Sequence, residues 1–288
     1  MTDADQIQAP LGLLGSGRLR YGAAMRLWEQ GQLSTDALEV YRICAARDGE
    51  DPAVLMAQRG AVGPMAVPAP TPEEAIRTLL AESDRYLATM PGPGVADVRA
   101  GIARGRNRAV TVSKTENTVV AAHLPTALAA LLPDHPTLAL AIRQASPHLR
   151  WQSYDGYDPT LIGDAFLTGH AFCSLMGQDG AIPAQGFALG LFLIAPHILY
   201  RDHHHAAPEL YAPLTGPHGW RFQPGAALTI KLAHVPVWND PFQRHLTKVG
   251  PLPFLALFGW TADVNDPAKV LYAKDWAALE ALRIGEVS

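Results

Sequence analysis

The spacing of apolar residues changes character near the middle of this chain. In the first half, apolar positions recur at intervals of three and four, as on one face of a helix. The segments with this spacing are 36–47, 71–87, 124–132 and 136–144. Thr71 stands before Pro72 and two acidic residues, which is typical of a helix start because a hydroxyl caps the first amides. The first half is therefore predicted to be helical.

The second half has the pattern of short strands. From about residue 148, short apolar runs are separated by Gly, Pro, Asn and Asp at close intervals. The clearest runs are 186–195, 227–235 and 254–260. Such runs are typical of a closed or sandwiched all-β unit. A short helix is predicted near the end, at 275–283.

These patterns divide the chain into three predicted parts. Residues 1–68 form a partly helical extension, 69–147 a helical lead-in that packs on a barrel, and 148–288 a β-barrel with a short C-terminal helix. The segment Arg59–Pro70 is rich in Gly and Pro and is predicted to be a linker. Amphipathic helices cannot bury their apolar faces alone, so we expect them to pack beside the barrel mouth or to form a subunit contact, as in a homodimer.

Composition narrows the class of protein. The 288 residues are 48% hydrophobic, with a formal net charge of -4 and no basic block, which argues against nucleic acid as the main partner. The sequence predicts no membrane contact, because no window of ~18 apolar residues occurs and the N-terminus lacks a basic, apolar leader. Cys44 and Cys173 are far apart and match no paired metal spacing. A cytoplasmic protein with reduced, buried thiols is expected.

Candidate chemistry is concentrated between Tyr200 and Gly216, where three histidines stand in a row. Alternate residues of an extended chain share a face, so His203, His205, Glu209 and Tyr211 are expected on one side. Imidazole and carboxylate groups bind Zn, Fe, Mn, Co or Ni, and a further ligand usually comes from elsewhere in the chain. We predict one divalent metal ion, of unassigned identity. A solvated polar loop is the alternative.

The spacing His203-x-His205-x3-Glu209-x6-Gly216 resembles the first conserved motif of the cupin superfamily. The wider sequence, roughly Leu149 to Asp263, resembles the cupin-type dimethylsulfoniopropionate lyases and their close relatives. The resemblance implies a mainly β fold, a cupin double-stranded β-helix or jelly-roll barrel, with an α-helical N-terminal region.

The resemblance also implies a ligand set. His205, Glu209 and one later histidine would bind the metal, with His203 either binding it or lining the site. The spacing to the segment G-P-L-P-F-L-A-L favours His245 as the later histidine. An insertion before it, N-D-P-F-Q-R, keeps His234 as a rival.

Roles for two tyrosines follow from the same resemblance. Tyr211 would be a metal-adjacent base and Tyr200 a second tyrosine that contacts substrate. The implied enzyme is a carbon-sulfur lyase whose substrate carries a carboxylate and a sulfonium, and which forms acrylate and dimethyl sulfide. Aromatic faces stabilise a desolvated cation, so substrate binding is predicted at Phe192, Trp220 and Trp260. Further candidates are Trp151, Tyr154 and Trp238.

Two other functions fit the same ligand types. Cupin sites also support dioxygenation and isomerisation with other metals, and some cupins bind small molecules without turnover. An oxygen requirement would favour a dioxygenase, and an intact metal site without turnover would favour a binding protein.

Overall fold

The computed structural model describes residues 3–63 and 70–285 of the chain. It divides into two compact units, Met1–Ala69 and Pro70–Ser288, which are treated separately below. Half of the predicted linker Arg59–Pro70, residues 64–69, lies outside the described residues. Within the described part, no helix is long and apolar enough to cross a membrane.

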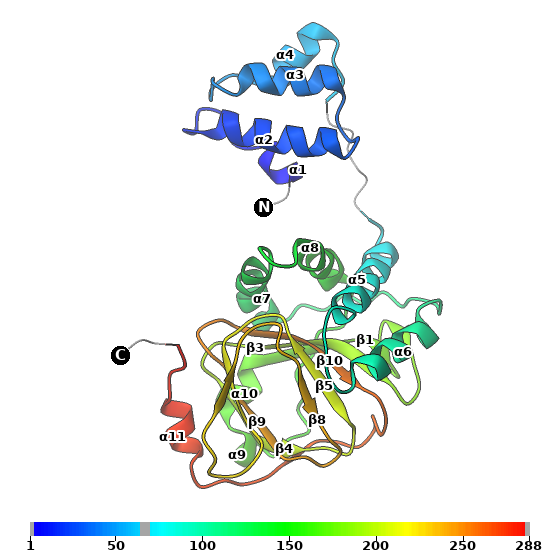
Figure 1. The fold of residues 1–288 in the computed structure, drawn as a ribbon, viewed down its shortest axis with the longest axis vertical. Helices are drawn as coiled ribbons and strands as arrows, with labels where there is room; N and C mark the ends of the chain where they lie inside the picture. The colour runs from blue at the N-terminus through cyan, green and yellow to red at the C-terminus, as the bar shows by residue number, and fades with distance from the viewer. Residues whose placement is uncertain (1–2, 64–69, 286–288) are drawn as a thin grey trace. The chain divides into compact units, whose positions relative to one another are not determined.

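The first unit is a small helical bundle (Figure 1). Its helices are α1 (Asp3–Gln6), α2 (Ser16–Glu29), α3 (Thr35–Cys44) and α4 (Pro52–Arg59). The predicted helical segment from residue 36 corresponds to α3, and the Ser34 side chain caps it by accepting from the Ala37 amide. A core that includes Leu27, Val40 and the buried thiol of Cys44 holds the helices together.

The second unit begins with a layer of helices. They are α5 (Pro72–Leu87), α6 (Val95–Gly105), α7 (Thr118–Leu131), α8 (Pro136–Ala145) and the 3-10 turn η1 (Ser146–His148). The predicted start of α5 is confirmed, because Thr71 and Glu74 form a reciprocal capping box. Two further short helices, α9 (Pro159–Ile162) and α10 (Asp164–Gly169), precede the first strand. The β region therefore begins at His170, later than the sequence pattern indicates.

Two sheets face each other in this unit (Figure 1). The strands are β1 (His170–Gly177), β2 (Ile182–Pro183), β3 (Ala188–Ile194), β4 (Leu199–His204), β5 (Glu209–Pro213), β6 (His218–Arg221), β7 (Thr229–Lys231), β8 (Val237–Asn239), β9 (His245–Lys248), β10 (Phe254–Trp260) and β11 (Lys269–Val270). One sheet has the order β2-β1-β3-β10-β5-β8 and the other β11-β4-β9-β6-β7. Neighbours are antiparallel except β1 and β2. This arrangement is the predicted cupin double-stranded β-helix.

The predicted run 227–235 is only partly a strand. Pairing with β6 covers Thr229–Lys231 and no more. The predicted closing helix is present as α11 (Trp276–Ala281), which packs on the five-stranded sheet through Trp276.

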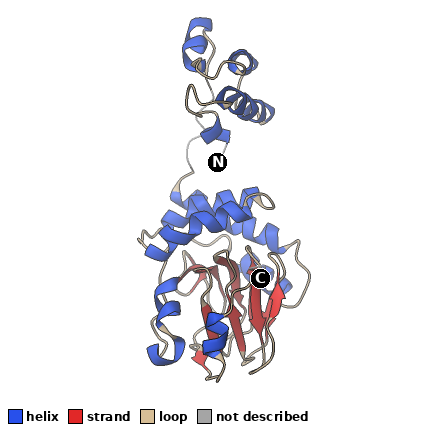
Figure 2. Ribbon diagram, turned by 90° about the vertical axis from the view of Figure 1, so that its left-hand side faces the viewer, coloured by secondary structure: helices blue, strands red, loops and turns tan. Residues whose placement is uncertain are grey.

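The helical layer covers the outer face of the six-stranded sheet (Figure 2). Leu189, Leu191 and Leu210 point outward into a core shared with α5 to α8. Helix α6 can pack closely on β10 because position 259 is a glycine, where an added Cβ would lie 2.6 Å from Val98 of α6. Helix packing on this face leaves the space between the two sheets available for a site.

Candidate metal centre and cavity

Three predicted metal ligands meet between the sheets. His203 is on β4, His205 follows the end of that strand, and His245 begins β9, directly opposite His203 in the strand pairing. One ring nitrogen from each lies within 4.8 Å of the others, and all three residues are buried. No second group of this kind occurs among the described residues.

Backbone carbonyls fix the orientation of all three rings. In each ring Nδ1 lies 2.8 Å from a carbonyl oxygen, and the acceptors belong to Arg201, Ala207 and Gln243. Nδ1 therefore carries a proton, and Nε2 is the nitrogen free to bind an ion. Nε2 of His203 and of His245 is buried without a hydrogen-bond partner in the described part of the chain. An unpaired buried acceptor is costly unless something binds it.

Glu209, on β5 of the other sheet, completes the cluster. Its Oε2 lies 3.2 Å from His205 Nε2 and 3.5 Å from His245 Nε2. Trp260 Nε1 donates to Oε1 at 2.6 Å, and Asn239 Nδ2 donates to Oε2 at 2.9 Å. Burial alone would raise the pKa of the Glu209 carboxyl, but His205 and His245 outweigh burial and hold that pKa well below its usual range. The carboxylate is thus charged and rigidly held.

This donor set fits one divalent ion. Three imidazoles oriented by carbonyls and one hydrogen-bonded carboxylate are the ligands and outer partners of many protein metal sites. Burial lowers the pKa of His205, but the Glu209 carboxylate more than offsets this and raises it, so metal binding would release a proton. The three ring nitrogens lie within 4.8 Å of one another, and an ion at ~2.0–2.1 Å from each would require them to move closer together.

The structure places His234 outside this cluster. Its Nδ1 lies 2.9 Å from the Tyr86 hydroxyl, and its Nε2 lies 3.7 Å from a carboxylate oxygen of Asp134. His234 sits in the loop after β7, where the chain leaves the sheet. Of the two rival histidines, His245 is the one next to His203 and His205.

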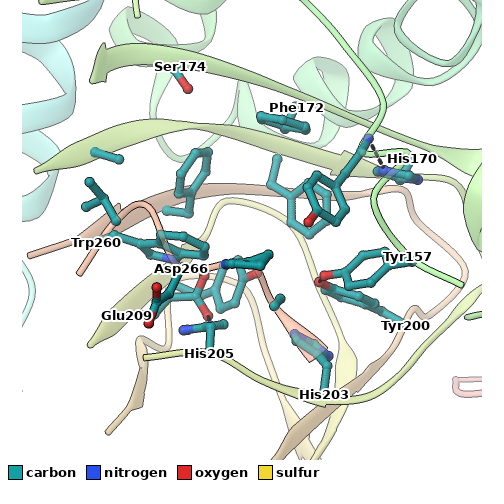
Figure 3. A pocket seen from close by; sticks show the side chains of 18 of the residues that line it. Tyr157, His170, Phe172, Ser174, Tyr200, His203, His205, Glu209, Trp260 and Asp266 are labelled. Atoms are coloured by element: carbon teal, nitrogen blue, oxygen red, sulfur yellow. Dashed lines mark hydrogen bonds and ion pairs between the residues drawn. The ribbon is translucent and has the colours of Figure 1, made fainter. Parts of the chain in front are cut away.

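A cavity of about 350 Å³ opens beside the ligands (Figure 3). His203, His205 and Glu209 lie along one wall, and Phe172 and Ser174 lie opposite. Most of the other lining residues are apolar or aromatic. The full remaining set is Tyr154, Tyr157, Phe166, His170, Ala188, Phe192, Tyr200, Tyr211, Phe258, Trp260, Val264, Asn265, Asp266, Pro267 and Ala268. The helices α5 to α8 contribute nothing to this lining, so they cover a sheet face and do not close the cavity.

Both predicted tyrosines line the cavity. Tyr211 shares the inner face of β5 with Glu209, whereas Leu210 between them points to the helical core, as strand alternation predicts. Burial raises the pKa of the Tyr211 hydroxyl well above its ordinary value, and the Glu209 charge raises it further. Tyr200 stacks on His203 with ring centroids 3.8 Å apart. An irregularity in the β4–β9 pairing between these two residues lets both side chains face inward.

Only some of the aromatic residues that were predicted to bind substrate line the cavity. Phe192 and Trp260 line the cavity, as does Tyr154. Trp220 does not: it is fully buried, with its ring 5.6 Å from the Tyr211 ring and 5.9 Å from Phe254. Strand alternation indicates which face a side chain occupies but not its depth in the barrel, and Trp220 lies behind the cavity wall. Trp151 and Trp238 are also absent from the lining.

Sequence reasoning did not identify three residues near the ligands. Tyr157 lines the cavity from an irregular segment before α9. His170 lines it from the first residue of β1, and its Nε2 accepts from the Tyr154 amide. Asn239 holds Glu209 because β8 pairs with β5 in the register Glu209↔Asn239. Because β6 and β7 lie between β5 and β8 in the chain, no hairpin spacing marks Asn239, and no local pattern marks Tyr157.

The fold and the ligand cluster define this protein as a cupin with a candidate metal centre. A family model described as dimethylsulfoniopropionate lyase matches residues 98–256, more than half of the chain. The chain belongs to that family, as its sequence resemblance indicated.

Individual known proteins are also similar to this chain. The chain is 28% identical over 151 residues to a protein of Cereibacter sphaeroides provisionally assigned as dimethylsulfoniopropionate lyase DddL, a match that covers 50% of this chain and 60% of that one. The chain thus spans about three fifths of that relative's length. A solved structure from work on the lyases RdDddP and RnDddQII has a TM-score of 0.54 at 18% identity, covering 70% of this chain and 100% of that one, which shows a shared fold. The lyase DddQ of Ruegeria pomeroyi has a TM-score of 0.48 at 22% identity, covering 69% of this chain and 98% of that one.

Proposed function

We propose that this protein cleaves dimethylsulfoniopropionate to acrylate and dimethyl sulfide by a base-assisted elimination. The observation that carries the proposal is a cluster of three oriented histidines and a charged glutamate beside a cavity that a buried tyrosine also lines. Membership of the dimethylsulfoniopropionate lyase family supports the choice of substrate.

His203, His205, Glu209 and His245 are assigned as the residues that would hold one divalent metal ion. When bound, the ion supplies positive charge that attracts a carboxylate and offsets negative charge developing beside it. Asn239 and Trp260 keep the Glu209 oxygens in place for that purpose.

Tyr211 is assigned as the base. Its phenolate takes the proton from the carbon next to the substrate carboxylate, and the new electron pair forms the carbon-carbon double bond. The carbon-sulfur bond breaks at the same time, and its electrons leave on the sulfur as dimethyl sulfide. Burial and Glu209 disfavour the phenolate, so nearby positive charge is required for Tyr211 to act near neutral pH.

The sulfonium is assigned to the aromatic wall. Phe192 and Trp260 present ring faces to the cavity, and a desolvated cation over an aromatic face is stabilised by ~2 kcal/mol or more. The apolar lining also keeps water away from the leaving group.

The test is release of dimethyl sulfide into headspace by purified protein, with Tyr211→Phe as the key variant. This change keeps the ring but removes the base, so turnover should fall by ~10²- to 10⁴-fold while metal content stays the same. Tyr86→Phe is the matched control, because it also removes a buried hydroxyl but lies outside the cavity.

Two results would contradict this function. Near-normal activity in Tyr211→Phe would exclude Tyr211 as the base. Consumption of oxygen without any dimethyl sulfide, in protein with its full metal content, would instead assign the site to a dioxygenase.

A further inference from the structure

The described residues that line the cavity include no lysine or arginine. The charged side chains among them are acidic, Glu209 and Asp266. The indole N–H of Trp260 is already used by Glu209. The neutral side-chain donors that remain for an anionic group of a ligand are the phenol hydroxyls, the Ser174 hydroxyl and the Asn265 amide. Ser174 lies on the wall opposite the ligand histidines, whereas the Tyr200 phenol stacks on His203.

Two of these phenols form a pair. The hydroxyls of Tyr157 and Tyr200 are hydrogen-bonded to each other, and both residues are buried. Figure 3 shows the two hydroxyls meeting inside the cavity. Two phenols carry two protons, and their mutual hydrogen bond uses one. Because neither hydroxyl has another hydrogen-bond partner among the described residues, one O–H remains available to a ligand.

Packing holds this pair beside the metal ligands. The Tyr200 ring is stacked between Phe166 at 4.1 Å and His203 at 3.8 Å. Tyr157 packs edge-on against Tyr154, with centroids 4.6 Å apart. Burial raises the pKa of the Tyr157 hydroxyl, so it remains a proton donor at neutral pH.

The segment that carries Tyr157 is anchored on both sides. On one side the Tyr154 amide donates to His170 Nε2 at 2.9 Å. On the other, the Asp158 side chain caps α9 by accepting from the Thr160 amide at 2.9 Å. Tyr157 is therefore held in position although it lies outside any helix or strand.

We propose that Tyr157 is a substrate-positioning residue: it fixes the Tyr200 hydroxyl so that the pair presents one O–H donor to the substrate carboxylate. The identity of that substrate rests on the proposed function. A cavity without lysine or arginine, lined by phenols and aromatic faces, selects a small zwitterion that carries a carboxylate and an onium group. The carboxylate lies at the tyrosine pair and the ligand wall, and the onium group lies against the aromatic rings.

The test compares two ligands that each carry one half of such a zwitterion. Acrylate has the carboxylate and tetramethylammonium has the onium charge. Calorimetry on the full chain, with metal content measured first, should show that Tyr157→Phe weakens acrylate binding by about tenfold. Loss of a hydrogen bond to a charged group weakens binding by about this factor or more, and the smaller effect is expected because Tyr200 keeps its own hydroxyl. Tetramethylammonium binding should change less than about twofold, because its contacts are with ring faces.

Tyr86→Phe should leave the affinities for both ligands unchanged. In turnover assays Tyr157→Phe should raise KM more than it lowers kcat, since the contact forms in the bound substrate. The double variant Tyr157→Phe with Tyr200→Phe should bind acrylate no more weakly than Tyr200→Phe alone, because the two hydroxyls act as one unit.

Each possible result of these measurements either supports or contradicts the positioning role of Tyr157. Equal loss of affinity for both ligands would show that Tyr157 only supports packing and would overturn the proposal, as would additive losses in the double variant or unchanged acrylate binding in Tyr157→Phe. Selective loss for acrylate supports it. If that selective loss occurs in a protein that releases no dimethyl sulfide, the proposed lyase function fails and the positioning role of Tyr157 stands.

Discussion

The second unit contains two groups of clustered histidines with different environments. The His203 and His245 rings lie 4.0 Å apart between the sheets, and the His135 and His234 rings lie 4.6 Å apart where α8 begins. In the first group each Nδ1 is bonded to a carbonyl, and buried Nε2 atoms lack partners in the described chain. In the second, His234 uses Nδ1 with the Tyr86 hydroxyl, and its side chain is 27% exposed.

The difference shows what distinguishes a ligand from a merely clustered histidine. Ring proximity is similar in both groups. What differs is whether a buried nitrogen remains without a protein partner, because such a nitrogen is stabilised by an ion. In the second group both ring nitrogens of His234 face neighbouring side chains, Nδ1 the Tyr86 hydroxyl and Nε2 the Asp134 carboxylate.

The largest expected effect is loss of metal. His205→Ala or His245→Ala removes one of the converging nitrogens, so each should abolish retention of metal after a mild chelator wash. The loss should exceed the ~10- to 100-fold that removal of an outer partner such as Asn239 costs. Metal analysis by atomic spectroscopy measures this directly.

His234→Ala is the matched control and should retain its metal. If His234→Ala lost metal while His245→Ala kept it, the distinction between the two groups would be wrong. Retention of full metal by both ligand variants would mean that His205 and His245 do not hold the ion.

Much of this contrast could be predicted from sequence. The motif from His203 to Gly216 indicated a cupin barrel, and strand alternation separated Glu209 and Tyr211 from Leu210. Spacing along the chain favoured His245 over His234. The fold and the two faces of β5 could be predicted because they depend on local periodicity and on a motif within two consecutive strands. The ligand role of His245 stays a prediction.

The remaining features depend on long-range geometry. Trp220 was expected at the cavity, but its depth in the barrel is set by the pairing of β6 with β9. Tyr157 lies in an irregular segment, and it reaches Tyr200 because Gln152 pairs with Phe172 at the start of the barrel. Tyr200 faces inward because of the irregularity in β4 pairing. Periodicity does not encode any of these positions.

A buried ionic cluster is the next target, because it lies directly behind the ligand histidines. Asp202 is fully buried next to His203, and its carboxylate accepts from Arg221 at 2.7 Å, Arg244 at 2.9 Å and Trp276 at 2.7 Å. Asp202→Asn removes the buried charge that faces Arg221 and Arg244, and it leaves Arg221 paired with the partly exposed Asp275. Breaking a buried ion pair typically costs ~3–5 kcal/mol. Urea unfolding should show that loss, and metal affinity should weaken because His203 and His245 flank the cluster.

Asp275→Asn is the control for this effect. Asp275 also pairs with Arg221, but its side chain is 37% exposed, so solvent screens the pair. The loss of unfolding free energy in Asp275→Asn should therefore be well below the loss in Asp202→Asn. Equal destabilisation by the two variants would contradict the importance of the buried cluster.

His218 is a buried histidine of a third kind, which differs from both groups. His218 has both nitrogens engaged: Nδ1 accepts from the Gly250 amide at 3.1 Å, and Nε2 lies 3.3 Å from the Thr215 hydroxyl oxygen. Burial lowers the pKa of His218 to about 3, so the folded protein keeps it neutral where the unfolded chain, with a pKa of ~6.5, takes up a proton. Stability from this group is present above pH ~6.5 and is lost as pH falls, by about 2–3 kcal/mol between pH 6.5 and 4.5.

His218→Gln removes that titration. The variant should be less stable than the wild type at pH 7.5 but should lose stability less steeply on acidification, as measured by urea unfolding across the pH range. Parallel curves for the two proteins would show that His218 does not take up a proton on unfolding. Metal content should be unchanged in either case, because His218 offers no free nitrogen.

The smallest effect concerns His234 itself. It has a backbone φ of 66°, which glycine adopts without strain, and its ring bonds the Tyr86 hydroxyl. His234→Ala keeps the backbone strain and loses the contact, so it should destabilise by ~1–2 kcal/mol. His234→Gly loses the same contact but relieves the strain, so it should be closer to the wild type, within ~1 kcal/mol. Tyr86 keeps an acceptor in either variant, because the Pro213 carbonyl lies 3.3 Å from its hydroxyl. If urea unfolding found the alanine variant more stable than the glycine variant, backbone strain would not be what limits stability at position 234.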